Sequence, residues 1–553
     1  MFVRTKKSGP YTYLQIVYSQ RVDGRVRQRV VGTLGRLDSL RESGELDALT
    51  VSMQQFSEKL AVIGAAAGAQ AQTGPFRRIG AALIFGRLWE ELGIGAVVKE
   101  VLRGRRFEFS VERALFLSVL QRLVAPGSDR QGERWREDYL IEGVEELELQ
   151  HFYRAMAWLG EPLPKEEQDG ATPFAPRCTK DLIEEALFAR RRDLFSGLDL
   201  VFFDTTSIYF EGQGGETIGR HGHNKDHRPD RKQMVVGAIL DSQGHPVCAE
   251  LWPGNTTDVK TLLPVADRLK KRFRIGRIAL VADRGMISEE TVRKLDELGW
   301  LYILGVRMRS WREVGDKVLA DAGAYQEIVP ERRKSKDPAP LKVKEVQVGG
   351  KRYIVCLNEE EARKDRHDRE AILAALREAL KRGDKALVGN RGYRRYLKAP
   401  KDHFNIDERK AVEEAKYDGK WVLLTNTDLT AVDTAMKYKG LWMVEDIFRS
   451  AKTLLATRPV FHKCDQTIRG HVWCSFLALV LRKELQDRLE ALGRKDNAPA
   501  PEWADIVRDL EALGQTEFRA GGKRYLIRTE ARRAAARAFA ACGMALPPLI
   551  RQI

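Results

Sequence analysis

Three carboxylates stand where an acid is costly to bury. Residues 200–204 and 277–283 are apolar runs of strand length, and each ends in an aspartate, Asp204 or Asp283. A third acid, Glu445, lies at the edge of an apolar helical stripe. An acid that ends one strand is usually a turn or capping residue. Two such acids and a third on a helix are harder to explain in this way, because like charges buried together need a cation to neutralise them.

The three acids predict a site for hard divalent cations. Ligand sets made only of carboxylate oxygens suit Mg²⁺ or Mn²⁺. Two such ions about 4 Å apart would activate the attacking oxygen and stabilise the leaving oxygen of a phosphodiester. We therefore expect a two-ion site formed by Asp204, Asp283 and Glu445, with Mg²⁺ or Mn²⁺ as the cofactor.

Glu445 belongs to a segment that we expect to be one amphipathic helix from Tyr438 to Lys452, without Gly or Pro after Gly440. Tyr438, Glu445 and Lys452 are seven residues apart and should stack along one line of that helix, with Arg449 beside them. Taken alone, this segment is equally compatible with a solvated surface helix in which Glu445 pairs with Arg449 four residues later.

The elements around the first two acids predict a ribonuclease-H-like α/β core. Three strands that can form a meander are followed by a helix, a strand, a helix that begins after Ser288, and a fifth strand. In this layout the acids occupy the tips of the first and fourth strands. The expected elements are, in order, 200–204, 233–240, 245–252, 262–273, 277–283, 288–298 and 300–306.

Glu445 follows Asp283 by 162 positions (445 − 283), too many for a direct connection. We therefore expect residues 307–425 to form an inserted subdomain that returns to the core at 421–425. Its expected elements are β runs at 341–348 and 351–357 and a charged helix at 359–382. It also contains cations and aromatics suited to gripping phosphates and stacking on unpaired bases, although a solvated loop is equally compatible: Asn390, Arg391, Tyr393 and Arg394.

These motifs together resemble those of the DDE transposases. The Tyr438–Lys452 segment is similar to the Y-x2-R-x3-E-x6-K signature of the bacterial insertion-sequence-four type. Further segments that resemble family motifs are Asp204-Thr205-Thr206, Gly222-His223-Asn224-Lys225-Asp226-His227-Arg228, Pro253-Gly254-Asn255-Thr256-Thr257-Asp258, Val281-Ala282-Asp283-Arg284-Gly285-Met286, Arg458-Pro459-Val460-Phe461-His462 and Ile468-Arg469-Gly470-His471.

The resemblance covers residues 200–480 and implies Asp204, Asp283 and Glu445 as metal ligands. It also implies that the inserted subdomain at 307–425 is mostly β. It implies Tyr438 and Lys452 as groups that position DNA, and we add His223, Lys225 and Arg284 as expected DNA contacts. The arginine of the signature is replaced by Leu441, and our hypothesis is that Arg449 supplies the missing cation.

The chain outside the core divides into three further expected modules. Residues 1–76 should be β-rich, with a hairpin at Asp23-Gly24, and residues 77–195 should be a helical DNA-binding module. On the strand after the hairpin, a basic face could lie on phosphates or protect a sheet edge; it consists of Arg25, Arg27 and Arg29. The core should resume at 426–495, and a small α-rich module should occupy 496–553.

The composition agrees with a DNA-binding protein. The net charge of +16 favours a polyanionic partner, and no apolar run has the length of a membrane span. The amino terminus lacks an apolar signal core, and six scattered cysteines fit a reducing compartment, so we expect a cytoplasmic, nucleoid-associated protein. A zinc site made of His462, Cys464, His471 and Cys474 would match none of the common finger spacings.

We therefore expect a transposase that binds the terminal inverted repeats of its insertion sequence and cleaves DNA by metal-activated hydrolysis. The freed 3′-hydroxyl would then attack the opposite strand or target DNA. The expected partners are double-stranded DNA and a second copy of the chain on paired ends, with no membrane and no nucleotide cofactor. The alternatives are a nuclease of the same fold without strand transfer and a catalytically silent DNA-binding protein.

Overall fold

The computed structural model describes the chain except for residues 23–24, 51, 54–71, 170, 172–174, 192–198, 224, 226–227, 274–277, 330–339, 382–395, 399–404, 456 and 521–522. The chain divides into two compact units, each described here by itself. The first comprises residues 1–84, 137–141 and 489–553, and the second comprises 85–136 and 142–488. In the described parts of the chain, no helix is long and apolar enough to span a bilayer.

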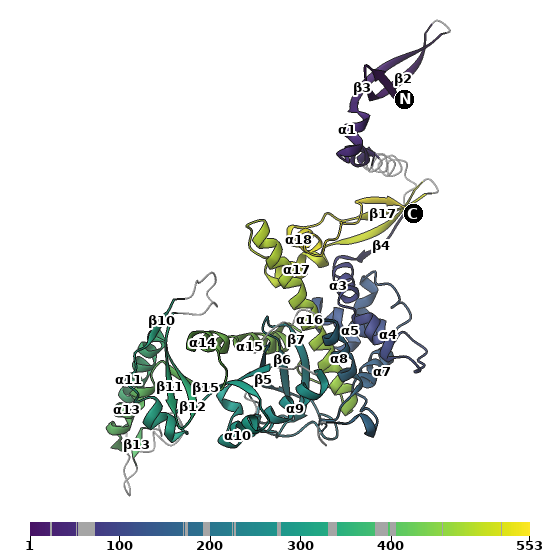
Figure 1. The fold of residues 1–553 in the computed structure, drawn as a ribbon. Helices are drawn as coiled ribbons and strands as arrows, with labels where there is room; N and C mark the ends of the chain where they lie inside the picture. The colour runs from purple at the N-terminus through teal and green to yellow at the C-terminus, as the bar shows by residue number, and fades with distance from the viewer. Residues whose placement is uncertain are drawn as a thin grey trace. The chain divides into compact units, whose positions relative to one another are not determined.

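The second unit is built on a nine-stranded sheet with the order β10-β11-β12-β15-β9-β8-β5-β6-β7 (Figure 1). β5, β6 and β7 form an antiparallel meander, and β8 and β9 continue from β5 in parallel. This order confirms the predicted ribonuclease-H-like core. The strands are β5 (Asp199–Tyr209), β6 (Gln233–Leu240), β7 (Pro246–Pro253), β8 (Ile278–Ala282) and β9 (Leu301–Gly305).

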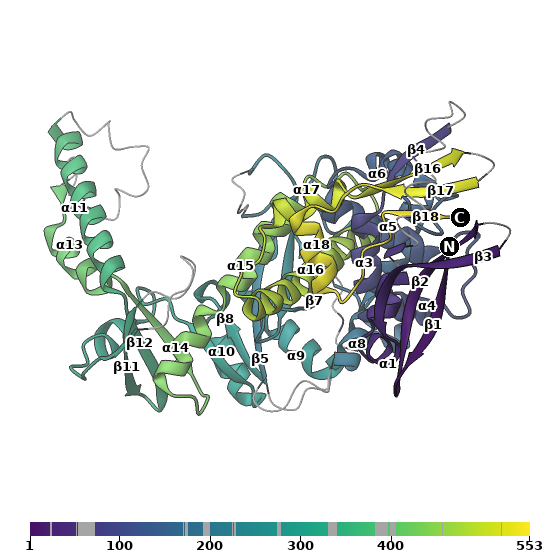
Figure 2. The same cartoon turned by 90° about the horizontal axis from the view of Figure 1, so that it is seen from above.

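The insertion extends this sheet, since β15 pairs antiparallel with β9. The added strands are β10 (Gln326–Ile328), β11 (Leu341–Val348), β12 (Lys351–Leu357) and β15 (Lys420–Thr425). The predicted helix at 359–382 is present as the 23-residue α11 (Glu359–Lys381). A second helix, α13 (Glu408–Glu414), makes the insertion mixed α/β rather than mostly β. α11 and α13 lie side by side (Figure 2). They pack through Leu373, Leu376 and Ala411, beside the short pair β13 (Leu397–Lys398) and β14 (Asn405–Ile406).

Each face of the sheet is covered by its own helices. One face, which includes Phe203 and Ala282, packs against α9 (Leu262–Phe273) and α10 (Glu289–Glu297). The hydroxyl of Ser288 accepts the Thr291 N–H at 3.1 Å, which confirms the predicted cap of α10. The opposite face, which includes Phe202 and Val281, packs against α14 (Ala431–Lys439), α15 (Trp442–Arg449) and α16 (Asp465–Lys495).

The expected continuous helix from Tyr438 to Lys452 is interrupted. It consists of the end of α14, a tight turn at Gly440, α15 and the π-helical turn η9 (Ser450–Leu454). The Gly440 N–H bonds the carbonyl three residues back, at 2.9 Å, which tightens the turn. A β-carbon at Gly440 would lie 2.7 Å from Phe202 Cζ, so only glycine allows this close approach to β5. Tyr438 and Glu445 therefore lie on different helices.

A buried ionic network joins α8 to α9 and β7. The guanidinium of Arg272 contacts the carboxylates of Glu184 at 2.7 Å, Asp181 at 3.3 Å and Glu250 at 3.2 Å. Lys180 contacts Asp181 at 2.6 Å. The helices of this region are α3 (Gly80–Glu91), α4 (Ile94–Val101), α5 (Val111–Val124), α6 (Asp129–Trp135), α7 (Leu149–Leu159) and α8 (Thr179–Arg191).

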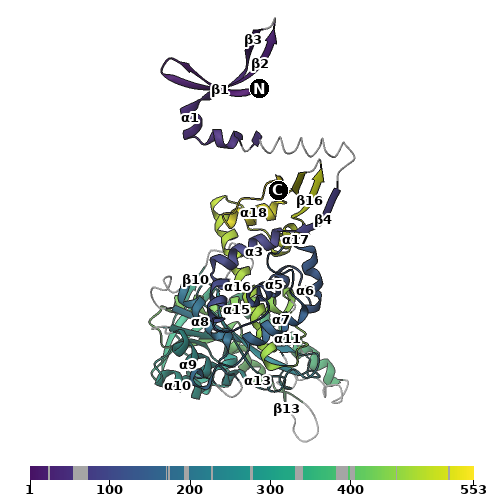
Figure 3. The ribbon, with the colours of Figure 1, turned by 90° about the vertical axis from the view of Figure 1, so that its right-hand side faces the viewer.

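The first unit contains two small sheets. The three-stranded sheet contains the predicted hairpin, β2 (Tyr11–Val22) with β3 (Arg25–Arg36), and also β1 (Phe2–Ser8), with α1 (Leu37–Glu42) after it. The second sheet has the order β18-β17-β16-β4, of which Figure 3 labels β16 and β4. It pairs β16 (Gly514–Ala520) with β4 (Gln72–Arg78), so the expected boundary at residue 76 falls inside a strand.

This second sheet corrects the prediction of an α-rich carboxy-terminal module. Only the run at 523–528 was expected to be β; β16 pairs with it and, on its other side, with β4, which lies more than 400 residues away in the sequence. The module contains α17 (Trp503–Glu511), β16, β17 (Lys523–Arg528), α18 (Arg533–Ala541) and β18 (Ile550–Gln552).

Candidate active site

Asp204 and Asp283 lie side by side where the parallel pairing of β5 and β8 ends. The register pairs Phe203 with Ala282, so the next position on each chain is an aspartate. Side chains alternate along a strand, so Asp204 lies on the face of Phe202 and Asp283 on the face of Val281. Both of these faces belong to the side of the sheet that α14 and α15 cover. The two acids therefore share one face.

The position of Asp204 differs from the expected strand tip. β5 continues past Asp204 to Tyr209, because its second half pairs with β6, and Asp204 itself lies opposite Ala238. Only the parallel pairing with β8 ends at this point. The sequence pattern showed where the apolar run stops, but a strand with a partner on one side can continue through polar residues.

Burial disfavours the ionised form of the Asp204 carboxyl group. Burial raises its pKa to about 6, the charges of Asp283 and Asp258 add to the rise, and Lys225 and the Thr205 N–H oppose it. The Thr205 N–H donates to Asp204 Oδ1 at 2.7 Å. A divalent cation would relieve this repulsion, and the ligand atoms are all carboxylate oxygens, so the residues present fit Mg²⁺ or Mn²⁺.

Tyr438 reaches the site from α14 and donates a hydrogen bond to Asp283 Oδ1 at 3.0 Å. The resemblance implied a tyrosine that positions DNA, whereas here the hydroxyl orients a candidate metal ligand. Gly305, at the end of β9, leaves the space for the ring, since a β-carbon there would clash with the Tyr438 hydroxyl. Arg307 braces the turn after Asp283 by donating to the carbonyls of Arg284 at 2.9 Å and Gly285 at 2.8 Å.

We predict that Gly305→Ala lowers the rate of DNA cleavage by about 10- to 100-fold, since it displaces the Tyr438 ring that holds Asp283. Combining Gly305→Ala with Tyr438→Phe should recover part of the loss, because the clashing hydroxyl is removed. Gly299→Ala is the matched control for space, as no atom lies within 4 Å of its β-carbon position, although its positive φ adds strain of its own. Equal rates for Gly305→Ala and the wild type would contradict this role of Tyr438.

Glu445 lies in the first turn of α15, exposed, and its side chain makes no hydrogen bond or ion pair within the described part of the chain. The expected pair with Arg449 is not formed; Arg449 is exposed and lies 3.9 Å from Asp446. Val444 and Phe448 anchor α15 on the face that carries Asp204. Lys452 lies half-buried in η9.

The three acids do not form a group whose ligand atoms all lie within 4.8 Å of one another; among the described residues only Asp129, His462 and His471 do so. A two-ion site does not require such closeness. Asp204, Asp283 and Glu445 would hold two ions about 4 Å apart, and acids that bind different ions need not lie within contact distance of one another.

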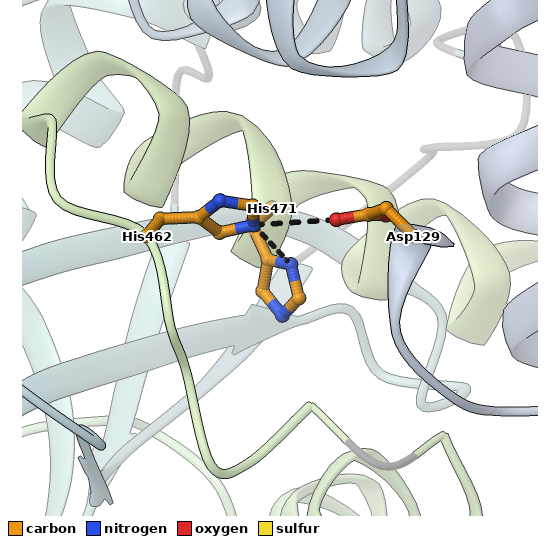
Figure 4. Close-up of side chains that lie close together, drawn as sticks. All are labelled: Asp129, His462 and His471. Carbon is orange, nitrogen blue, oxygen red and sulfur yellow. Dashed lines mark hydrogen bonds and ion pairs between the residues drawn. The ribbon is translucent and has the colours of Figure 1, made fainter. Parts of the chain in front are cut away.

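The cluster of Asp129, His462 and His471 is better explained as a polar contact than as a zinc site (Figure 4). His462 Nε2 lies 3.1 Å from His471 Nδ1 and 3.5 Å from Asp129 Oδ2. The guanidinium of Arg122 already occupies the cluster, 3.0 Å from His471 Nδ1 and 3.6 Å from Asp129 Oδ1. Of the two cysteines considered as zinc ligands, Cys464 is exposed, and burial raises the pKa of Cys474 to about 12.

The remaining expected DNA contacts lie at separate places. His223, Lys225 and Arg284 are exposed residues of the second unit, and Lys225 reaches the acid pair. Arg27 and Arg29 are exposed on β3, but Val26 and Val30 are exposed as well, so the strand has no buried face there. The side chain of Arg25 is not described. The following residues lie outside the described part of the chain: Asn390, Arg391, Tyr393 and Arg394.

Three residues of the site were missed as functional candidates: Asp258, Gly305 and Arg307. Asp258 was visible as the last residue of a family-like motif, but nothing in its spacing placed it near Asp204. Gly305 and Arg307 close the fifth predicted strand. Their importance follows only from the course of α14 over β9.

The comparisons with known families agree with this geometry. A model described as Transposase DDE domain matches residues 196–481, more than half of the chain, and one described as IS1634 family transposase, N-terminal domain, matches residues 2–67. No curated protein matches the chain. The amino-terminal match is to the IS1634 family, and the insertion-sequence-four signature is not confirmed by it. The chain therefore belongs to the DDE transposases, enzymes that use divalent metal ions to cleave DNA and transfer the cleaved strand.

Proposed function

We propose that Asp204, Asp283 and Glu445 hold two Mg²⁺ or Mn²⁺ ions, and that the enzyme cuts DNA at the terminal inverted repeats of its own element. One observation carries this proposal. The register of β5 and β8 brings two aspartates together on the face that α15 covers, and α15 presents Glu445 without another partner in the described chain.

The ions, when bound, would activate the attacking oxygen and stabilise the leaving oxygen of a phosphodiester. The protein groups fix this arrangement. Tyr438 holds one oxygen of Asp283, and the Thr205 N–H holds one oxygen of Asp204. The attacking oxygen belongs first to water and then to the freed 3′-hydroxyl, so the same acids serve both cleavage and strand transfer.

Cations around the acids would bind the DNA backbone. Lys225 and Arg284 border the acid pair, and Lys452 and Arg449 follow Glu445. We infer that Arg449 replaces the signature arginine, because Leu441, at the start of α15, is buried and carries no charge, whereas Arg449 on the same helix is exposed. An Arg449→Ala variant that keeps full strand-transfer activity would contradict this role.

The proposed partners are double-stranded DNA and a second copy of the enzyme. Two ends must be held together for coordinated transfer, which favours a homodimer on paired ends. The exposed Arg27 and Arg29 of the first unit supply charge for backbone contact, which is sequence-independent and sensitive to salt.

The test is a transfer assay with the purified full chain, a linear DNA that carries one element end, and a supercoiled target. With Mg²⁺ or Mn²⁺ we expect nicked ends and joined products, and with EDTA neither. Pre-cut ends with a free 3′-hydroxyl should join without the first step. Nicking without any joined product would favour a nuclease, and nicking that persists in EDTA would exclude the two-ion site.

A further inference from the structure

Both the backbone and the side chain of Lys225 form hydrogen bonds with β5, the strand that carries Asp204. Its backbone N–H donates to Ser207 Oγ at 2.8 Å, and its ammonium donates to the Thr205 carbonyl at 2.7 Å. The ammonium also lies 3.3 Å from Thr205 Oγ1. A lysine side chain loses much rotamer freedom when it is fixed, and these hydrogen bonds offset that entropy cost.

Asp258, in the turn η4 (Asp258–Lys260), completes the arrangement. Its Oδ1 accepts the Thr205 hydroxyl proton at 2.7 Å, and its Oδ2 lies 3.4 Å from the Lys225 ammonium. The Thr205 hydroxyl group thus donates its one proton to Asp258, and the hydroxyl oxygen accepts a hydrogen bond from the Lys225 ammonium. The three side chains form one matched chain of donors and acceptors.

Asp258 approaches β5 on the face of the sheet opposite to Asp204. Thr205 follows Asp204, so its side chain points to the opposite face, where Phe203 packs on α9. Asp258 Oδ2 and Asp283 Oδ2 both lie 3.9 Å from the position of a β-carbon on Gly285. Asp258 is thus close to the acid pair without belonging to a compact ligand group with it.

We propose that Asp258 is a positioning residue for DNA cleavage, which acts by fixing, together with Thr205, the Lys225 ammonium beside Asp204, where it meets the phosphate of the strand to be cut. This inference rests on the proposed function of the acids. Asp258 acts through Lys225, so its effect requires that lysine.

The test is a double-mutant cycle in the full chain, with Asp258→Asn, Lys225→Gln and the combination. We expect Asp258→Asn to lower the kcat of nicking by about 10- to 100-fold, because the Lys225 ammonium would no longer be held where it contacts the phosphate. The KM for DNA should change little. In the Lys225→Gln background, Asp258→Asn should cause no further loss. Asp267→Asn is the matched control, an aspartate on α9 that pairs with Lys271 at the surface, and should cleave normally.

Two measurements separate positioning from other roles. The affinity for Mn²⁺, followed by electron paramagnetic resonance, should stay the same in Asp258→Asn and fall in Asp204→Asn. The melting temperature should match that of Asp267→Asn. If Asp258→Asn folds poorly, Thr205→Val should reproduce its kinetic loss and Thr205→Ser should not.

The inference is overturned if the two losses multiply in the double variant, or if Asp258→Asn weakens Mn²⁺ binding as Asp204→Asn does. Its failure is distinct from failure of the proposed function. An inactive Asp204→Ala beside a fully active Asp258→Asn rejects only the role of Asp258. An active Asp204→Ala rejects the acid site itself.

Discussion

Replacing Asp204 by asparagine is expected to lower the rate of DNA nicking by at least about 10³-fold, which corresponds to roughly 4 kcal/mol of lost transition-state stabilisation. The amide keeps the shape of the side chain and its contact with the Thr205 N–H. It removes the charge that would hold a cation between the strands. Asp283→Asn and Glu445→Gln should have losses of the same order, because we propose that all three acids hold the same two ions.

The measurement is single-turnover nicking of a labelled element end, with end binding followed separately by gel shift. Binding should stay within a few fold of the wild type, since the acids attract cations and not DNA. Glu297→Gln is the control, an exposed glutamate of α10 that pairs with Arg293 at 2.8 Å, and should nick at the wild-type rate. Normal nicking by any one of the three acid variants would remove that residue from the site.

Arg272→Met is expected to lower the free energy of unfolding of the second unit by about 3–5 kcal/mol. The guanidinium is 3% exposed and contacts three carboxylates that are themselves 1–4% exposed: Asp181, Glu184 and Glu250. Removal of one cation leaves buried anions without compensation, which costs much more than the loss of a surface pair.

The destabilisation should appear as a lower urea midpoint by tryptophan fluorescence and a larger insoluble fraction. Arg293→Met is the control, since Arg293 is exposed and its pair with Glu297 lies at the surface, so its effect should stay within about 0.5 kcal/mol. Equal midpoints for the two variants would show that the network around Arg272 contributes nothing to stability.

The sequence predicted those parts of the fold that depend on local pattern. β11 and β12 begin and end at the expected residues, α10 is capped by Ser288, and the order of the first five strands is correct. Apolar periodicity and cap chemistry act within a few residues, so one sequence is sufficient to reveal them.

The parts that depend on distant contacts were missed. The bend at Gly440 follows from the close approach of Phe202, more than 200 residues away, and β4 is a strand because β16 pairs with it. Lys180, Asp181 and Glu184 have the spacing of a solvated helix face, yet they are buried because α8 packs on α9 and β7. The local sequence pattern of a helix does not show which of its faces another helix or strand will cover.

The candidate site was predictable as a set of residues but not as an arrangement. Asp204, Asp283 and Glu445 could be proposed from the strand endings and the helix pattern. The roles of Asp258, Gly305 and Tyr438 depend on which atoms meet, such as the Tyr438 hydroxyl with Asp283. Their spacing in the sequence contains no information about that contact.

The pairing of β15 with β9 has a consequence for the order in which the enzyme becomes competent. β15 immediately precedes α14 and α15, so we expect α15, which carries Glu445, to pack on the sheet only after the insertion has joined the edge of β9. Contacts this distant in sequence form slowly, because loop-closure entropy must be overcome first. A chain emerging from the ribosome would hold its first two acids early and remain unable to cut until residue 445 has been made and folded into place.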